Sequence, residues 1–185
     1  LVIFTESIKT LEFLGQQLRS DLKLKDDQIA TLRGDQGDTV LMETVEAFGK
    51  TQSPLRLLIC SDVASEGINL HHLSHKMIHF DIPWSLMVFQ QRNGRIDRYG
   101  QKHQPQIRYL LTEASEPQIN GDMRVLEVLI NKDEQAQKNI GDSSEFTGKF
   151  TQEEEEEQVA EFMMQDDGAS LFDDLLNSNV TENSE

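Results

Sequence analysis

Short apolar segments alternate with amphipathic segments over residues 1–112, and this alternation restricts the fold more than any other feature of the chain. The apolar segments predict strands at 1–5, 28–32, 55–60, 77–80 and 106–111. Between them, segments 7–19, 39–50 and 85–98 place apolar residues at helical spacing, with Ser7 and Thr39 as candidate N-caps. Such alternation is typical of βαβ units, in which helices cover both faces of a parallel sheet.

Charge divides the chain near residue 141. The segment 141–185 holds 14 acidic residues and one basic residue, whereas the preceding 140 residues hold 19 acidic and 16 basic ones. The net charges are therefore −13 and −3. We expect one folded domain over residues 1–140, ending in a helix at 116–139, and an acidic tail over 141–185 that is disordered or partly helical.

The tail carries one apolar cluster between acidic pairs. Its members are Leu171, Phe172, Leu175 and Leu176. They fit either a weak helix that docks on its own domain or a short helix that binds a protein partner. The acidity of the tail suggests a second hypothesis, that it competes with nucleic acid for basic groups of the domain; the alternative is a solubilising extension.

Several classes of protein are excluded by what the sequence lacks. No apolar run approaches the ~18 residues that a membrane span requires, and the single cysteine, Cys60, cannot build a disulfide framework. Five histidines lack metal-binding spacing, so we expect no metal site and regard them as surface or loop residues. The chain does not begin with Met and shows no secretion signal, so we expect a fragment of a longer cytoplasmic protein.

The first segment with chemical character follows the predicted strand 55–60. Ser61 and Asp62 stand where that strand ends, which is the edge where open parallel sheets bind ligands. Ser65 and Gly67 follow closely and would let the backbone approach a phosphate. By itself the segment fits an ordinary helix start equally well.

The second segment covers residues 90–98. On a helix, Gln91, Arg95 and Arg98 would fall within an arc of about 60°. Gly94 costs about 1 kcal/mol relative to Ala inside a helix, which suggests a close approach to the backbone there. Arginine binds phosphate oxygens bidentately, although a solvated basic face is the simpler explanation of the pattern alone.

Taken together and in order, the two segments resemble motifs V and VI of superfamily-two helicases. Glu66 before Gly67, the segment 81–84 (Asp-Ile-Pro-Trp) and the segment 100–102 (Gly-Gln-Lys) are similar to the Swi/Snf and bacterial RapA-like branch. Segments 1–7 and 32–35 are similar to motif IV and to the second strand with its turn. The resemblance implies the second RecA-like lobe of a P-loop NTPase-like motor, working in the bacterial cytoplasm or nucleoid.

The resemblance also implies roles for individual residues. Arg95 and Arg98 would be arginine fingers that complete the ATP site. The other candidates for that site are Asp62, Glu66, Gly67, Gln91 and Arg92; of these, Gln91 would couple the lobes, and Arg92 would either face the nucleotide or bridge motifs within the lobe. The nucleic-acid backbone would meet Thr5, Ser7, Gly34 and Ser61.

The motifs that are missing limit what the chain can do alone. It contains neither a Gly-x-x-x-x-Gly-Lys-Ser/Thr loop nor an Asp-Glu-x-His segment, so ATP with Mg²⁺ would be held mainly by an N-terminal lobe. The resemblance to the Swi/Snf branch then implies part of a DNA-stimulated ATPase that tracks double-stranded DNA. A helicase-like binding platform without hydrolysis and an RNA helicase lobe are the alternatives, the latter disfavoured by Glu66. A Rossmann dinucleotide domain is disfavoured because no Gly-x-Gly-x-x-Gly follows the first strand.

Overall fold

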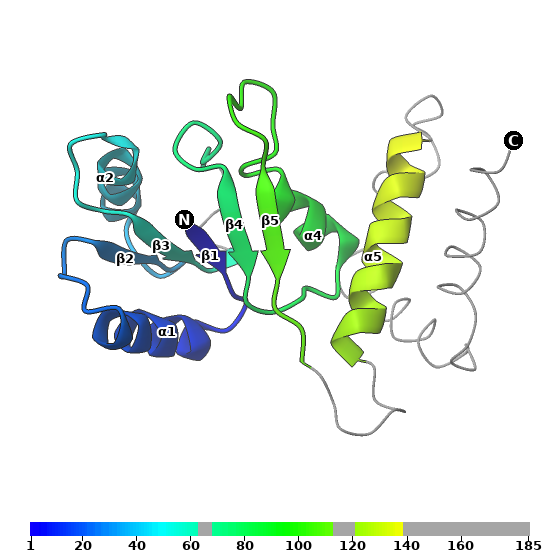
Figure 1. Cartoon of the computed structure of the whole chain (residues 1–185), viewed down its shortest axis with the longest axis horizontal. Coiled ribbons are helices and arrows are strands. Elements are labelled where there is room, and N and C mark those ends of the chain that lie inside the picture. Colours follow the sequence, from blue (N-terminus) through cyan, green and yellow to red (C-terminus); the bar gives the residue numbers. More distant parts are fainter. Residues whose placement is uncertain (63–67, 113–120, 139–185) are drawn as a thin grey trace, which may run out of the picture.

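The computed structural model describes residues 1–62, 68–112 and 121–138, with side chains described as far as 134. Its centre is a five-stranded parallel sheet in the order β2-β3-β1-β4-β5 (Figure 1). The strands are β1 (Val2–Phe4), β2 (Ile29–Leu32), β3 (Leu57–Cys60), β4 (Lys76–His79) and β5 (Gln106–Tyr109). The predicted α/β fold with a RecA-like parallel sheet is confirmed.

The register brings the carboxyl ends of the central strands to one edge. Phe4 of β1 pairs with Cys60 of β3 on one side and with His79 of β4 on the other. The chain therefore leaves all three strands at the same level of the sheet. Residues that follow these strands are placed close together, as the site requires.

The helices are α1 (Ile8–Asp21), α2 (Asp38–Gly49), α4 (Leu86–Asn93) and α5 (Gly121–Lys138). The Ser7 hydroxyl accepts from the N–H of Thr10 at 3.3 Å, so this predicted cap is confirmed. The predicted Thr39 cap is wrong. Gly37 occupies the N-cap position, with φ −66° and ψ 147°, and Thr39 lies within the helix that follows.

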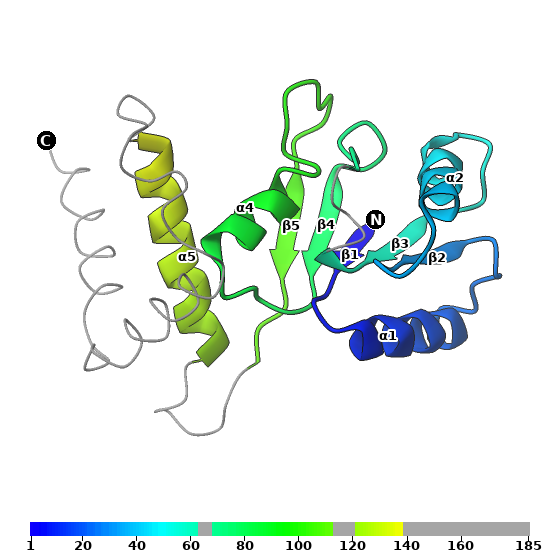
Figure 2. The same cartoon turned by 180° about the vertical axis from the view of Figure 1, so that it is seen from behind.

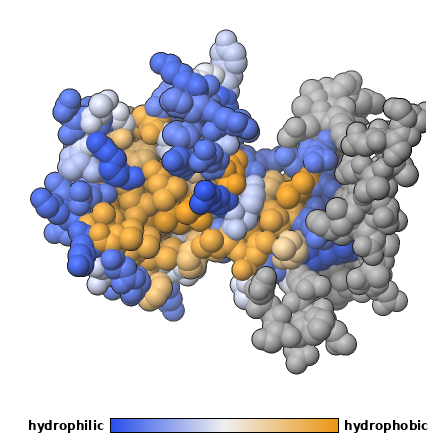
Figure 3. Space-filling model, viewed as in Figure 1, coloured by the Kyte–Doolittle hydropathy of each residue, from blue (hydrophilic) through white to orange (hydrophobic). Residues whose placement is uncertain are grey.

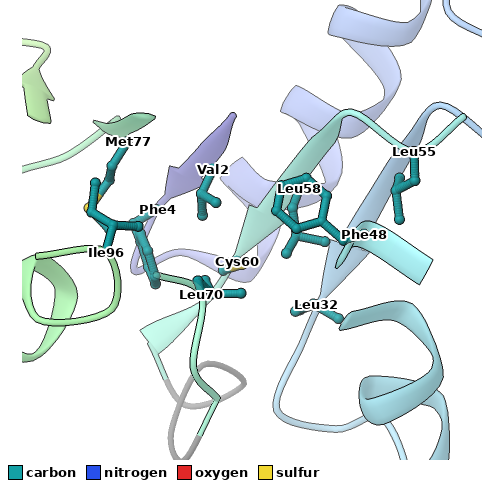
Figure 4. Packing of buried hydrophobic residues seen from close by; sticks show 10 residues of the cluster. All are labelled: Val2, Phe4, Leu32, Phe48, Leu55, Leu58, Cys60, Leu70, Met77 and Ile96. Atoms are coloured by element: carbon teal, nitrogen blue, oxygen red, sulfur yellow. The ribbon is translucent and has the colours of Figure 1, made fainter. Parts of the chain in front are cut away.

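Helices α1 and α2 lie on opposite sides of the sheet (Figures 1 and 2), and alternate residues of β1 and β3 belong to two different core clusters. Ile3 of β1 and Ile59 of β3 pack with Leu11 and Leu14 of α1. Phe4 and Leu58 belong to the other layer, which reaches Phe48 of α2 (Figure 4). Figure 3 shows the hydrophobic surface gathered between α1 and α2, with hydrophilic residues on the outer sides of both helices.

Two loop residues join the second layer, and they position the site. Leu70 precedes β4 and Ile96 follows α4, and both side chains are fully buried in the cluster that Figure 4 shows. The loops that carry them are thus anchored to the sheet by apolar burial.

The third cluster joins α4 to α5. Ile82 and Phe89 pack against Val125 and Leu129 of α5, and the Gln90 amide donates to Asp133 at 2.8 Å. Within the described ranges 1–62, 68–112 and 121–138, none of the helices combines the length and apolarity that crossing a membrane would need.

Candidate nucleotide and nucleic-acid site

The ends of β1 and β4 meet at a single carboxylate. The Asp81 side chain, which follows β4, accepts from the Thr5 hydroxyl at 2.5 Å and from the Glu6 N–H at 3.0 Å. Thr5 and Glu6 follow β1, so Asp81 fixes the start of the loop between β1 and α1. This role was not predicted from the sequence, although the position of Asp81 just beyond β4 parallels that of Asp62 just beyond β3.

Arg92 of α4 occupies the centre of the same edge. Its Nε and Nη2 donate to the two carboxylate oxygens of Asp62 at 2.6 and 2.8 Å, a bidentate pair. Its Nη2 also donates to Asp81 Oδ1 at 3.1 Å, and Nη1 donates to the Asp81 carbonyl at 2.9 Å. Arg92 therefore ties the ends of β3 and β4 to α4.

The environment of Arg92 keeps it charged although its side chain is only 1% exposed. Burial would lower the pKa of Arg92, but the hydrogen bonds and charges of Asp62 and Asp81 outweigh that effect and raise the pKa. A guanidinium bonded in this way to its own lobe is a bridge between motifs. Of the two roles that the resemblance allowed for Arg92, bridging is the one that this geometry supports.

A chain of buried and partly buried polar groups continues from Arg92 toward β5. His79 Nδ1 lies 3.5 Å from Arg92 Nη1, and His79 Nε2 lies 2.9 Å from Asn93 Oδ1. The Asn93 amide nitrogen in turn lies 3.4 Å from the hydroxyl oxygen of Tyr109. Burial, and then the charge of Arg92, lowers the pKa of His79 to about 4, so the ring is neutral at pH 7.

The prediction that the histidines lie on the surface or in loops is wrong for His79, which is fully buried within β4. His71 lies in the loop before β4, as that prediction allows, although its side chain is only 8% exposed. The pairing of His79 with Asn93 joins residues 14 positions apart, so no local spacing could have indicated it.

Arg95 and Arg98 do not lie on a helix face with Gln91, and that prediction is wrong. Helix α4 ends at Asn93, and Gly94 is its C-cap. Beyond it, the Ile96 N–H donates to the Asn93 carbonyl at 3.1 Å as the chain turns to bury Ile96 in the core. A Cβ at Gly94 would lie 3.1 Å from the Gln90 carbonyl, so the helix end itself accounts for the glycine.

Both arginines instead reach the loop that precedes β4. Arg95 Nη1 donates to the Ile68 carbonyl at 3.3 Å, and Arg98 Nη1 donates to Asn69 Oδ1 at 2.6 Å. The Leu70 N–H donates to the Arg95 carbonyl at 3.2 Å, which joins the two loops through their backbones. The C-terminal ends of the two segments singled out in the sequence, at residues 68–70 and 95–98, therefore lie together. They are joined by contacts between loops and not by a shared helix face.

The remaining predicted residues divide into buried and exposed positions. Thr5 is fully buried with its hydroxyl on Asp81, and Ser61 is 3% exposed, so neither side chain is placed to contact nucleic acid. Ser7 and Gly34 are exposed where the chain leaves β1 and β2, and Gln91 is exposed on α4. Glu66 and Gly67 lie outside the described residues.

The parallel sheet order and the polar edge at its carboxyl ends define a RecA-like α/β lobe. Residues 1–100 match the helicase conserved C-terminal domain family. This chain belongs to that family.

Solved structures show the same fold at low sequence identity. The C-terminal part of the Fun30 ATPase domain superimposes with a TM-score of 0.59 at 19% identity, over 88% of this chain and 47% of that one. Domain 2 of the DEAD-box helicase Mss116p bound to an RNA duplex gives a TM-score of 0.54 at 23% identity, over 71% of this chain and 46% of that one. The C-terminal domain of the DEAD-box protein Dbp5 gives a TM-score of 0.53 at 17% identity, over 72% of this chain and 69% of that one. This chain thus spans about half the length of the first two.

Proposed function

We propose that this chain is the C-terminal motor lobe of an ATP-dependent translocase of the Swi/Snf type, in the RapA-like branch, and that it acts on double-stranded DNA. The single observation that carries the proposal is the convergence of Arg95 and Arg98 on residues 68–70. These loops belong to the two segments that resemble motifs V and VI. An N-terminal lobe would hold ATP and Mg²⁺ and face these two loops.

Arg95 and Arg98 are proposed to supply positive charge to that shared site. A guanidinium beside the γ-phosphate stabilises charge that develops during phosphoryl transfer, an effect worth ~10³ to 10⁵ in rate. Bound Mg²⁺ would neutralise phosphate charge from the other side of the site. Arg95 and Arg98 are hydrogen-bonded to Ile68 and Asn69, which belong to the loop before β4. Presentation of both side chains to ATP would therefore depend on the position of that loop.

The other candidate residues have more indirect parts in this proposal. The Asp62 carboxylate is bound by Arg92, so Asp62 would act on the nucleotide side by holding the segment that contains Glu66 and Gly67. Gln91 would couple the lobes from the exposed face of α4. Ser7 and Gly34, which are exposed at the carboxyl edge, remain the candidates for the nucleic-acid backbone.

The acidic tail is proposed to oppose nucleic-acid binding. With a net charge of −13 against −3 for the rest, residues 141–185 would compete with phosphates for basic groups. Deletion of 141–185 should then strengthen DNA binding and steepen its salt dependence. Unchanged affinity and salt dependence would leave the tail as a solubilising extension.

The proposal is tested by ATP turnover of the protein that carries both lobes. Turnover is measured alone, with duplex DNA and with RNA of matched length. The proposal expects strong stimulation by duplex DNA, with negligible turnover by the isolated 185-residue chain. Stimulation by RNA alone would identify an RNA helicase lobe, and nucleic-acid binding without turnover would identify a binding platform; either result contradicts the proposal.

A further inference from the structure

One amide group lies where the two arginine-bearing loops meet. Gln101 Nε2 lies 2.7 Å from the His71 carbonyl, 3.0 Å from the Ser74 carbonyl and 3.1 Å from the Ile96 carbonyl. Its two hydrogens are thus shared among three acceptors from two segments. His71 and Ser74 belong to the loop that leads into β4, whereas Ile96 lies between Arg95 and Arg98.

The backbone around Gln101 is arranged to deliver this amide. Gly100 has φ +96°, a conformation that side chains other than glycine rarely adopt. A Cβ at Gly100 would make only ordinary van der Waals contact with the His72 ring, at 3.4 Å, so the positive φ rather than lack of space favours glycine here. On the other side of the amide, Gln101 Oε1 accepts from the His103 N–H at 3.1 Å, which fixes the orientation of the side chain.

The remaining links between the loops stand close to this amide. The Leu70 N–H reaches the Arg95 carbonyl, and the buried side chains of Leu70 and Ile96 lie in one core cluster. The loops lie side by side beyond the same ends of β4 and β5 in both views (Figures 1 and 2). Without the Gln101 donor, the carbonyls of His71, Ser74 and Ile96 would each lose the hydrogen bond that this amide gives them.

We propose that Gln101 is a positioning residue for the arginine pair. Its amide joins residues 71–74 to residue 96. This link keeps Arg95 and Arg98 beside Ile68 and Asn69, the residues to which their side chains donate hydrogen bonds. Gln101 is three residues beyond Arg98 and acts through it and through Arg95. This inference rests on the proposed function, because it assigns Gln101 a part in presenting those arginines to ATP.

The decisive change is Gln101→Glu, which keeps the shape of the side chain but replaces the donor with a negative oxygen facing three carbonyls. In the protein that carries both lobes, kcat should fall about tenfold while the Kd for ATP stays within about twofold, because displacement of a group that acts in the transition state lowers turnover. Gln104→Glu is the matched control: it makes the same chemical change at an exposed position of the same loop and should leave kcat unchanged.

A double-mutant cycle separates positioning from a loss of folded protein. In an Arg95→Ala background, Gln101→Glu should lower kcat much less than in the unmodified protein, because the group that it positions is already absent. An equal factor in both backgrounds, or no loss in the unmodified protein, would overturn the inference. If Arg95→Ala itself leaves turnover intact, the proposed function fails instead.

Amide hydrogen exchange tests the link itself, independently of turnover. Gln101→Ala should accelerate exchange of the Leu70 N–H, which depends on the two loops staying together, while exchange at Leu58 in the centre of the sheet stays the same. Unchanged protection at Leu70 would show that Gln101 does not join the loops, whatever the kinetic result.

Discussion

At the carboxyl edge of this sheet, a few single residues link the ends of the strands to one another. Arg92 is the clearest case, because one buried guanidinium satisfies Asp62, the Asp81 carboxylate and the Asp81 carbonyl. The Asp81 carboxylate in turn accepts hydrogen bonds from Thr5 and Glu6. Four separate segments of the chain therefore depend on the charge and shape of one side chain.

Arg92→Met should destabilise the full chain by about 3 kcal/mol, because it leaves two partly buried carboxylates without their cation. Arg92→Lys should recover only part of this loss, since an ammonium cannot reproduce the planar bidentate contact. Urea unfolding measures both. Arg108→Ala, at an exposed position of β5, serves as the control and should cost less than about 0.5 kcal/mol. Equal midpoints for Arg92→Met and Arg108→Ala would contradict the bridging role.

His79 adds a dependence on pH. Its pKa is lowered to about 4 in the folded chain from a usual value of 6.5, so the unfolded chain binds the proton more readily. The contribution of His79 to the free energy of unfolding is therefore fully present above pH 6.5. It decreases as the pH falls toward 4, by about 3 kcal/mol in total. The groups that face the ring are Arg92, Asn93, Tyr109 and Asp81.

His79→Gln removes this titration, so its free energy of unfolding should change less between pH 7 and pH 4 than that of the unmodified chain. Denaturant unfolding at a series of pH values measures the difference. His71 and His75, whose pKa values are also lowered by burial, remain in both proteins and cancel from the comparison. Parallel pH profiles would contradict the proposed buried, neutral state of His79.

At the scale of elements, turns determine where the site residues lie. Helix α4 ends at Asn93, so Arg95 and Arg98 are carried by a turn rather than by a helix. Gly100 continues the turn with a positive φ. Gly37 makes a different use of glycine: it starts α2 with an ordinary negative φ and no side-chain cap.

Serine should therefore have opposite effects at these two glycines. Gly37→Ser should stabilise the chain by about 0.5 to 1 kcal/mol, because a Cβ there meets nothing within 4 Å and the hydroxyl can cap α2. Gly100→Ser should destabilise it by about 1 kcal/mol or more, because φ +96° is unfavourable for serine. Thermal unfolding compares the two, and shifts of the same sign would contradict the assigned conformations.

The elements followed from the sequence because apolar periodicity is local, and all five predicted strands are present with ends shifted by one or two residues. The helix expected at 85–98 was too long, since burial of Ile96 and the geometry at Gly94 depend on tertiary packing. The long-range polar pairs could not be predicted from spacing. Asp81 with Thr5 and Arg92 with Asp62 join residues 76 and 30 positions apart, and only the sheet order brings them together.

At the scale of the whole molecule, we propose that the lobe contributes part of an ATP site that it shares with another lobe. It belongs to the helicase C-terminal family and carries arginines on paired loops, but its sequence contains no phosphate-binding loop. We propose that Arg95 and Arg98 act on ATP held by another lobe, and that they contribute to turnover more than to affinity.

The most direct test measures ATP binding and DNA-stimulated turnover separately in the two-lobe protein with Arg95→Ala. Arg108→Ala removes the same charge from an exposed position of β5 and serves as the control. We expect Arg95→Ala to leave the Kd for ATP nearly unchanged and to lower kcat by about 10³-fold, whereas Arg108→Ala should change neither. Turnover by Arg95→Ala equal to that of the unmodified protein would contradict this proposal.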